Sequence, residues 1–292
     1  MSWKTALVCA LGRRLRPGWS ASALVGLLEG AVLLARPRRA VALGNLRLAF
    51  PEKTAEERRA LYRGCVRHLA WSAVECLVLD REPRQALEWV EEARGREWLD
   101  RPRGEGKGVV LVTPHLGNWE LCAAWMAQAG YPLCAIVRPP DDPEDAGFLE
   151  AFRERSGLKT LDKEAPMTRA VGVLRRGEIL GIVSDQHGGP KGVEAPFFGV
   201  VTSTVPGPSV FAHLTGCPVV MVESWREAPF RHRIRFSPVD WEVPGDREAR
   251  VREGTARVNA ALEGAIRRHP EQWLWQHRRF VEAMREGHFF EG

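Results

Sequence analysis

Two side chains suited to acid–base chemistry follow an apolar segment of the chain. Residues 109–121, VVLVTPHLGNWEL, begin as a β-branched run, stop at Pro114, and continue with His115 and, five residues later, Glu120. An imidazole with an ordinary pKa of about 6.5 suits a general base, and a carboxylate on one ring nitrogen fixes its tautomer. On one helix the two side chains would point about 140° apart. We therefore predict that His115 precedes a helix capped by Asn118, so that Glu120 folds back toward the imidazole.

The same spacing also has a purely structural interpretation. A buried histidine paired with a capping glutamate would stabilise a loop without doing chemistry. A histidine and a glutamate five residues apart form too short a pattern to exclude that interpretation, so the rest of the chain has to decide between the two.

HLGNWE resembles the signature block of the lipid A biosynthesis late acyltransferases, the lauroyl and myristoyl transferase family within the lysophospholipid acyltransferase superfamily, which carries an H-x4-D/E motif. Further blocks resemble those of the family, in the family's order, over residues 45–280. They are NLRLAFPE (45–52), VRP (137–139), RERS (153–156), SDQH with PFFG (184–187 and 196–199) and HPEQWLWQHRRF (269–280). The resemblance therefore covers most of the chain.

The resemblance implies acyl transfer from acyl-acyl-carrier protein to a hydroxyl of a lipid A precursor or related glycolipid. His115 would be the general base and Glu120 its orienting partner, with no covalent acyl-enzyme, no metal and no cofactor. The sequence has no G-x-S-x-G elbow, which agrees with a mechanism that needs only a base. The resemblance also implies that Arg155 stabilises the oxyanion or holds a phosphate, and that Asp185 positions Arg155. The remaining predicted substrate-binding residues are Arg138, Gln186 and Asn118.

Other polar motifs are weaker candidates. We interpret His277, in WLWQHRRF, as part of a block that packs against the sheet, while Arg278 and Arg279 could face acceptor phosphates. HGGPKG (187–192) lacks the ending of a P-loop, and GEGKG (104–108) precedes a strand instead of following one, so neither predicts a nucleotide site.

The elements that must position these residues follow an α/β pattern. Up to about residue 100 the chain reads as helical, with a capping box at Thr54 and Glu57 and a helix over 83–99. From Gly108 onward, short β-rich runs alternate with helices, which predicts a mostly parallel sheet flanked by helices, with chemistry at the carboxyl ends of the strands. The predicted strands are 109–113, 133–137, 180–184, 219–223 and 234–236. The predicted helices are 120–129, 145–155, 167–175, 209–214 and 247–268. The resemblance implies the glycerol-phosphate-acyltransferase-like form of this class.

The basic charge is concentrated at the N-terminus. Through Phe50 there are eight Lys and Arg residues against Glu29, a net charge of +7, whereas the whole chain carries +5. Residues 21–35 are apolar but shorter than the roughly 20 residues of a spanning helix. We interpret them as an interfacial anchor whose flank 36–39 contacts anionic headgroups at the cytoplasmic face of the inner membrane. An ordinary core helix with a solvated basic end remains the alternative.

These features give three predicted segments: 1–50 for membrane association, 51–107 as a helical region and 108–292 as the acyltransferase core. A basic segment confined to one end argues against a nucleic-acid-binding domain. The six cysteines show no CxxC pair and are expected to be reduced, mostly buried thiols. Two other functions remain open: acylation of a different glycolipid or a glycerolipid, and a membrane-docking or nucleic-acid-associated protein without catalysis.

Overall fold

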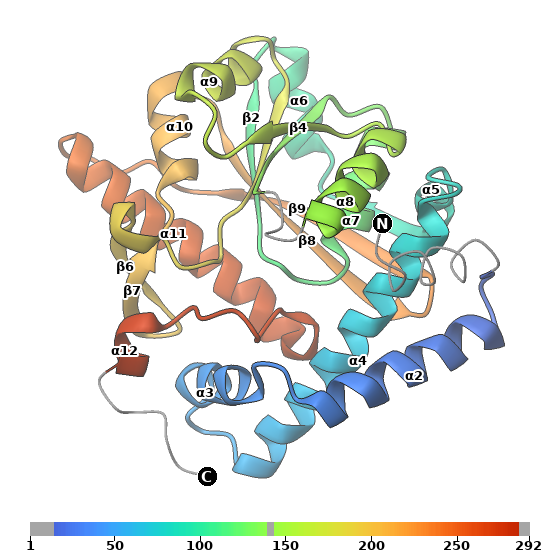
Figure 1. Cartoon of the computed structure of the whole chain (residues 1–292). Helices are drawn as coiled ribbons and strands as arrows, with labels where there is room; N and C mark the ends of the chain where they lie inside the picture. The colour runs from blue at the N-terminus through green and yellow to red at the C-terminus, as the bar shows by residue number, and fades with distance from the viewer. Residues whose placement is uncertain (1–14, 139–142, 286–292) are drawn as a thin grey trace.

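The structure is a computed structural model that describes residues 15–138 and 143–285 (Figure 1). Within these residues seven strands form one sheet in the order β1-β9-β8-β2-β5-β3-β4, and all neighbouring pairs are parallel except β8 and β9. The strands are β1 (Val90–Arg94), β2 (Val109–Thr113), β3 (Leu133–Val137), β4 (Lys159–Asp162), β5 (Ile179–Val183), β8 (Val219–Ala228) and β9 (Arg231–Val239). The predicted α/β fold with a mostly parallel sheet is confirmed.

Helices cover both faces of this sheet (Figure 1). The helices of the described residues are α2 (Trp19–Ala35), α3 (Arg39–Ala49), α4 (Ala55–Leu79), α5 (Gln85–Trp89), α6 (Glu97–Gly104), α7 (Trp119–Gln128), α8 (Pro143–Arg155), α9 (Met167–Arg175), α10 (Gly207–Thr215), α11 (Arg247–Arg268) and α12 (Val281–Arg285). Of these, α2 and α3 pack against α4, and α12 packs against the strand Val200–Thr204. The capping box is confirmed, because Thr54 accepts from the Glu57 backbone N–H while the Glu57 carboxylate accepts from the Thr54 backbone N–H.

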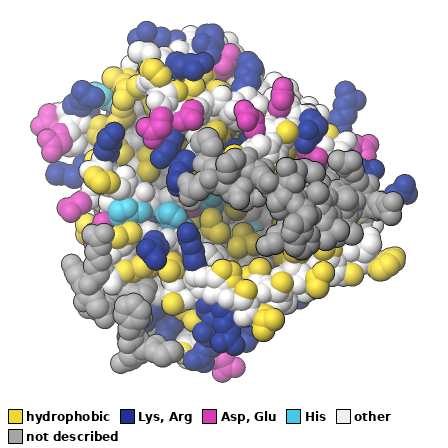
Figure 2. Space-filling model, in the orientation of Figure 1, with side chains coloured by type: hydrophobic (Ala, Val, Ile, Leu, Met, Phe, Trp, Pro, Cys, Tyr) yellow, Lys and Arg dark blue, Asp and Glu magenta, His cyan; other side chains and the backbone are white. Residues whose placement is uncertain are grey.

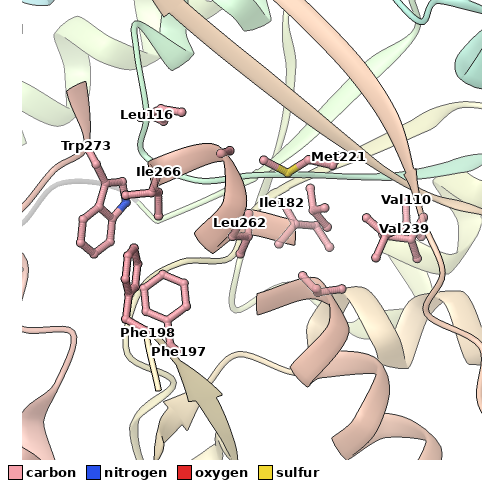
Figure 3. Close-up of a cluster of buried hydrophobic side chains, with 14 of the residues drawn as sticks. Val110, Leu116, Ile182, Phe197, Phe198, Met221, Val239, Leu262, Ile266 and Trp273 are labelled. Atoms are coloured by element: carbon pink, nitrogen blue, oxygen red, sulfur yellow. The ribbon is translucent and has the colours of Figure 1, made fainter. Parts of the chain in front are cut away.

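Strand β2 shows why the sheet needs cover on both sides. Its side chains alternate in direction, so Val110 and Val112 pack under α9, α10 and α11, whereas Val109 and Leu111 pack under α4, α6 and α7. A strand buried on both faces is an uninterrupted apolar run, which is what the sequence VVLV presents. Figure 3 shows the first of these cores, in which Val110, Ile182 and Met221 of the sheet meet Leu262 and Ile266 of α11.

The N-terminal helices pack against α4 along the lower edge of the molecule (Figure 1). No single helix among the described residues is long and apolar enough to cross a membrane. Taken together, α2 and α3 have the length and composition of a membrane span, but they meet at a 90° bend. The five described cysteines, Cys65, Cys76, Cys122, Cys134 and Cys217, are all free, and all but Cys76 are buried. Cys9 and the basic residues before residue 15 lie outside the described residues.

The helix predicted over 83–99 is wrong. Residues 85–89 form α5, but Val90–Arg94 extend into β1, which pairs with β9 at the edge of the sheet, and a new helix begins at Glu97. A glycine at position 95 separates the two, with a φ of +77° that other residues rarely adopt. The predicted helical region 51–107 therefore contributes a strand to the core. Strands β4, β6 (Val193–Phe197) and β7 (Val200–Thr204) were also not predicted, and β6 and β7 form a separate hairpin.

Candidate active site

The site lies at the carboxyl ends of β2 and β5, which are neighbours in the sheet. Thr113 ends β2 opposite Val183, the last residue of β5, because the two strands pair in parallel register. His115 follows Thr113 by two residues, and Asp185 follows Val183 by the same number. Equal offsets from paired residues bring the two side chains to the same height above the sheet edge.

The imidazole of His115 is held by Asp185. Nδ1 of His115 lies 2.7 Å from Oδ1 of Asp185, and the backbone N–H of His115 donates to Oδ2 at the same distance. Since a carboxylate only accepts, Nδ1 carries the proton and Nε2 keeps its lone pair. Burial raises the pKa of Asp185. The charge of His115 and the hydrogen bonds from His115 and Trp273 lower it by a larger amount, so this pKa lies below its ordinary value. Asp185 therefore stays ionised beside the imidazole.

The predicted pairing of His115 with Glu120 is wrong in this structure. Glu120 is the second residue of α7, and its carboxylate accepts two hydrogen bonds from Arg153, at 3.0 Å from Nε and 2.5 Å from Nη2. Both side chains are largely buried, and although burial lowers the pKa of Arg153, the pair with Glu120 raises it above its ordinary value. The Glu120–Arg153 pair joins α7 to α8, whereas the carboxylate that binds His115 is that of Asp185, which follows the neighbouring strand β5.

Arg155 is also not paired as predicted. Its guanidinium donates to Asp80, the residue that ends α4, and its side chain is about half exposed. Asp185, which was expected to position Arg155, is already engaged by His115 and Trp273. Two residues apart on one helix, Arg153 and Arg155 point about 160° apart, so only one of them can reach Glu120. The predicted pair of Arg155 with Asp185 is therefore absent from this structure, whereas the predicted role of Arg155 in substrate binding stays a prediction.

Asn118 caps α7 as predicted but does not face a substrate. Its Oδ1 accepts from the backbone N–H of Leu121 at 3.1 Å, and its Nδ2 donates to Glu75 of α4 at 2.9 Å. The side chain is buried, and its hydrogen bonds join the loop before α7 to α4. Glu75 in turn binds Arg226, whose side chain is largely buried, and the buried His232.

Gln186 and Arg138 end up at the same sheet edge as His115. The amide nitrogen of Gln186 lies 3.4 Å from Nε2 of His115, so it donates to the lone pair of that nitrogen. Arg138 directly follows β3, the other neighbour of β5, and is exposed. The next residue of the predicted VRP block, Pro139, lies outside the described residues.

Gly117 allows the loop between His115 and α7 to approach the sheet. It adopts a φ of +60°, and a Cβ on it would lie 2.0 Å from the backbone oxygen of Ser224 in β8. Its N–H donates to the carbonyl of Gln272 at 3.1 Å. A side chain at position 117 would therefore force the HLGNWE loop away from β8.

The C-terminal block encloses the site from the other side. Trp273 donates its indole N–H to Oδ2 of Asp185 at 2.6 Å, and the backbone N–H of Leu274 donates to the carbonyl of His115 at 3.1 Å. Sequence reasoning assigned this block to packing and missed the indole contact. The block's position late in the chain gave no sign of it, because the contact joins residues 88 positions apart.

The other polar residues of this block serve the structure. Nε2 of His277 accepts from the backbone N–H of His187 at 3.3 Å, and burial lowers the pKa of His277 to about 4. Arg279 is fully buried, donates to Ser203 and Thr204, and stacks over Phe197, so it does not face a phosphate. Burial lowers the pKa of Arg279 to about 10. Only Arg278 of the predicted pair is exposed.

The arrangement can take a proton from a hydroxyl. Nε2 of His115 carries a lone pair, Asp185 stabilises the imidazolium that forms, and α7 starts nearby, with the rings of His115 and Trp119 5.0 Å apart. Between residues 15 and 285, the gap at 139–142 excepted, no group of three or more His, Cys, Asp or Glu side chains could hold a metal ion.

Comparisons with known proteins point to one family. The sequence profile of bacterial lipid A biosynthesis acyltransferases matches residues 10–282. The chain is similar to the lipid A biosynthesis palmitoleoyltransferase of Escherichia coli (strain K12), at 31% identity over 254 residues, 85% of this chain and 81% of that protein. It is 27% identical to the lauroyltransferase of the same strain, over 87% and 83% of the two chains. A shorter match, 27% over 46% of this chain and 43% of the relative, is to a phosphatidylinositol mannoside acyltransferase of Mycobacterium tuberculosis.

Proposed function

Because the chain belongs to the bacterial lipid A biosynthesis acyltransferase family and is therefore an acyltransferase, we propose that it transfers a fatty acyl chain from acyl-acyl-carrier protein to a hydroxyl of a lipid A precursor or related glycolipid. The observation that carries the mechanism is the pair of His115 and Asp185 at the ends of two adjacent parallel strands. Such an edge is where folds of this class bind and convert ligands.

In the proposed reaction His115 acts as the general base. Its Nε2 takes the proton of the acceptor hydroxyl, and the oxygen attacks the carbonyl carbon of the fatty thioester. The carbon–sulfur bond breaks, an ester forms, and the imidazolium returns its proton to the departing thiolate. Asp185 holds Nδ1–H and stabilises the positive charge while the imidazolium exists, which takes over the role first assigned to Glu120.

One contact supports a direct attack without an acyl-enzyme. The side chain beside Nε2 of His115 is the amide of Gln186, not the hydroxyl or thiol of a nucleophile. In the proposed reaction the N-terminus of α7 and the same amide stabilise the charge that develops on the thioester oxygen, since both present N–H groups near the imidazole. The reaction then needs no metal or cofactor beyond the acyl donor.

A different acceptor is the second candidate. One relative is named as an acyltransferase of phosphatidylinositol mannoside, which is a glycolipid other than lipid A. Its match covers less than half of either chain, whereas the lipid A enzymes match more than four fifths of both. The lipid A precursor is therefore the first acceptor to test.

We also propose that α2 attaches the enzyme to the cytoplasmic face of the inner membrane. Its large apolar residues Trp19, Leu27 and Leu34 are 85%, 69% and 85% exposed and lie within about 80° of one another around the helix. Glu29 lies on the other side, where it faces Arg67 of α4 at 3.9 Å. Figure 2 shows apolar side chains along this lower right edge of the molecule. An apolar stripe of this kind suits a helix that lies in the membrane surface.

Substitution of the base tests the reaction. With an acyl-carrier thioester and each candidate acceptor, His115→Ala should lower turnover by about a thousandfold or more, measured as release of free thiol. His213→Ala, which removes a partly exposed histidine on α10, is the matched control and should retain wild-type turnover. Retained turnover in a folded His115→Ala protein would refute the mechanism, and turnover with another acceptor alone would refute the lipid A assignment.

A further inference from the structure

Oδ2 of Asp185 has no role in the proposed reaction, yet it accepts two hydrogen bonds whereas Oδ1 accepts one. Oδ2 accepts from the backbone N–H of His115 at 2.7 Å and from the indole N–H of Trp273 at 2.6 Å. We propose that Trp273 is a positioning residue for acyl transfer, whose indole N–H holds the Asp185 carboxylate with its other oxygen aimed at the imidazole. This inference rests on the proposed roles of His115 and Asp185.

A carboxylate at this position needs such a restraint. The terminal torsion of an aspartate is broad, so the carboxylate plane can turn unless both oxygens are held. Oδ1 already receives the hydrogen bond from Nδ1 of His115. With Oδ2 fixed from the backbone and from the indole, the plane of the carboxylate is set before the imidazole takes up a proton. The catalytic pair is then aligned in the free enzyme, which lowers the barrier to reaction.

The indole itself is fixed by its surroundings. The carbonyl of Trp273 accepts from the thiol of Cys65 at 3.0 Å, and Leu116 forms an isolated β-bridge with Trp273. The ring packs against Phe197 at 5.9 Å and stands perpendicular to Trp275 at 4.5 Å, and Figure 3 shows it above the two phenylalanines of the hairpin. Trp273 is 1% exposed, so its indole N–H is shielded from bulk water.

Trp275 provides a matched control within the same segment. It is also fully buried, and its indole N–H also makes a hydrogen bond of 2.6 Å, but to the carbonyl of Pro270 instead of Asp185. Phenylalanine at either position keeps an aromatic ring in the core and removes one indole donor. The two variants therefore cost similar packing, and only Trp273→Phe removes a donor from the catalytic carboxylate.

The kinetic test compares Trp273→Phe with Trp275→Phe in the full-length enzyme. Loss of a donor to a charged acceptor should lower kcat by about tenfold or more in Trp273→Phe, with KM within about twofold, and leave kcat in Trp275→Phe near wild type. A carboxylate with fewer donors is more basic and holds the imidazolium more strongly. The acidic limb of the kcat/KM profile should therefore move to higher pH in Trp273→Phe alone. Equal kinetics and profiles in the two variants would overturn the proposal.

A double substitution shows whether the indole acts through Asp185. Trp273→Phe should cost little further activity in a protein that already carries Asp185→Asn, whereas a general loss of packing would cost the same in both backgrounds. Additive effects would overturn the proposal. If the wild-type enzyme does not transfer acyl groups, or if His115→Ala still does, the proposed function itself is wrong. If the wild-type enzyme is active and depends on His115 but Trp273→Phe behaves like Trp275→Phe, only the proposal for Trp273 is wrong.

A measurement without activity covers the case in which Trp273→Phe does not fold. With indole nitrogen-15 labelling of the eleven tryptophans, the N–H protons of Trp225 and Trp273, which donate to Glu227 and Asp185, should resonate downfield, and the one that Trp273→Phe removes or Asp185→Asn moves belongs to Trp273. This resonance should move upfield in Asp185→Asn, while the Trp275 resonance stays in place. If no indole resonance responds to Asp185→Asn, Trp273 does not bind that carboxylate in solution and the proposal is wrong.

Discussion

At the scale of single residues, the main difference from the sequence prediction is which carboxylate meets the imidazole. The prediction chose Glu120 because it is five residues from His115 and can fold back from a helix start. The structure joins His115 to Asp185, 70 residues away, because both follow paired strand ends by the same two residues. The information was present in the sequence, since both residues were identified and both strands were predicted, but the order of strands in the sheet was not.

Substitution of the two carboxylates separates these alternatives. Asp185→Asn removes the charge that orients His115 and should lower kcat by about 10³- to 10⁴-fold, as expected when the carboxylate behind a catalytic histidine becomes an amide. Glu120→Gln weakens the pair with Arg153 and should reduce thermal stability more than it reduces kcat. Both values come from steady-state kinetics and thermal unfolding of the same preparations. A larger loss of kcat in Glu120→Gln than in Asp185→Asn would restore the original pairing.

At the scale of elements, Gly117 decides how closely the catalytic loop approaches β8. Gly117→Ala adds a Cβ 2.0 Å from a backbone oxygen at a φ of +60°, and should lower the free energy of unfolding by at least about 3 kcal/mol and reduce activity. Gly130→Ala is the control, because Gly130 has a φ of +83° but no atom within 4 Å of the added Cβ, so only the backbone strain, roughly 1–2 kcal/mol, remains. Chemical denaturation measures both. Equal losses would mean that the loop can retreat from β8.

The buried network around Glu75 fixes α4 to the sheet and to the cap of α7. Glu75 binds Arg226, His232 and Asn118 with no exposure to solvent, so Glu75→Gln leaves Arg226 buried without its full countercharge and should cost about 3–5 kcal/mol. Glu91→Gln, which breaks an exposed pair with Arg231, should have no measurable effect.

The cost of Glu75→Gln should also depend on pH. Burial raises the pKa of Glu75, but Arg226 and His232 lower it more, so this pKa lies below 4.5 in the folded protein. The contribution of the ionised carboxylate to stability is complete above pH 4.5 and is lost as the pH falls through the folded pKa. The difference between wild type and Glu75→Gln should therefore shrink below pH 4.5 in denaturation measured across that range. A gap that stays constant down to pH 3 would contradict the assigned direction of the shift.

Element boundaries show what the sequence could and could not predict. Strands β2 and β3 and helices α9 and α11 were predicted with both ends correct, because each is a continuous apolar run or a periodic run bounded by a proline, a glycine or a capping residue. Residues 90–94, VEEAR, carry charges at three of five positions, two of them adjacent, and have little apolar character, since β1 is an edge strand paired on one side. Only the pairing with β9 makes this segment a strand, and such long-range pairing leaves no periodic signal.

At the scale of the whole molecule, the division of the chain into a helical region (51–107) and an acyltransferase core (108–292) stays a prediction. In the structure β1 belongs to the central sheet, so residues 51–107 contribute to the same folded unit as the core. The same holds for the C-terminal block, which crosses back to reach His115, Gly117 and Asp185. The site therefore combines the loop after β2, the loop after β5 and the C-terminal block, which the folded sheet brings together. Three of the sequence blocks that resemble the acyltransferase family, HLGNWE, SDQH and HPEQWLWQHRRF, meet here although they are far apart in the sequence.

The exposed stripe of α2 leads to a prediction for the whole enzyme at a membrane. Leu27→Gln with Leu34→Gln removes two apolar contacts of about 1.5 kcal/mol each, so affinity for anionic phospholipid vesicles should fall by about a hundredfold in co-sedimentation. Leu87→Gln with Leu214→Gln, at leucines exposed on α5 and α10, is the matched control and should bind as wild type does. Because neither pair touches His115, transfer to a detergent-dispersed acceptor should be unchanged in both, while transfer to an acceptor embedded in vesicles should fall only in the first. Equal vesicle binding by the two double variants would mean that α2 does not contact the membrane.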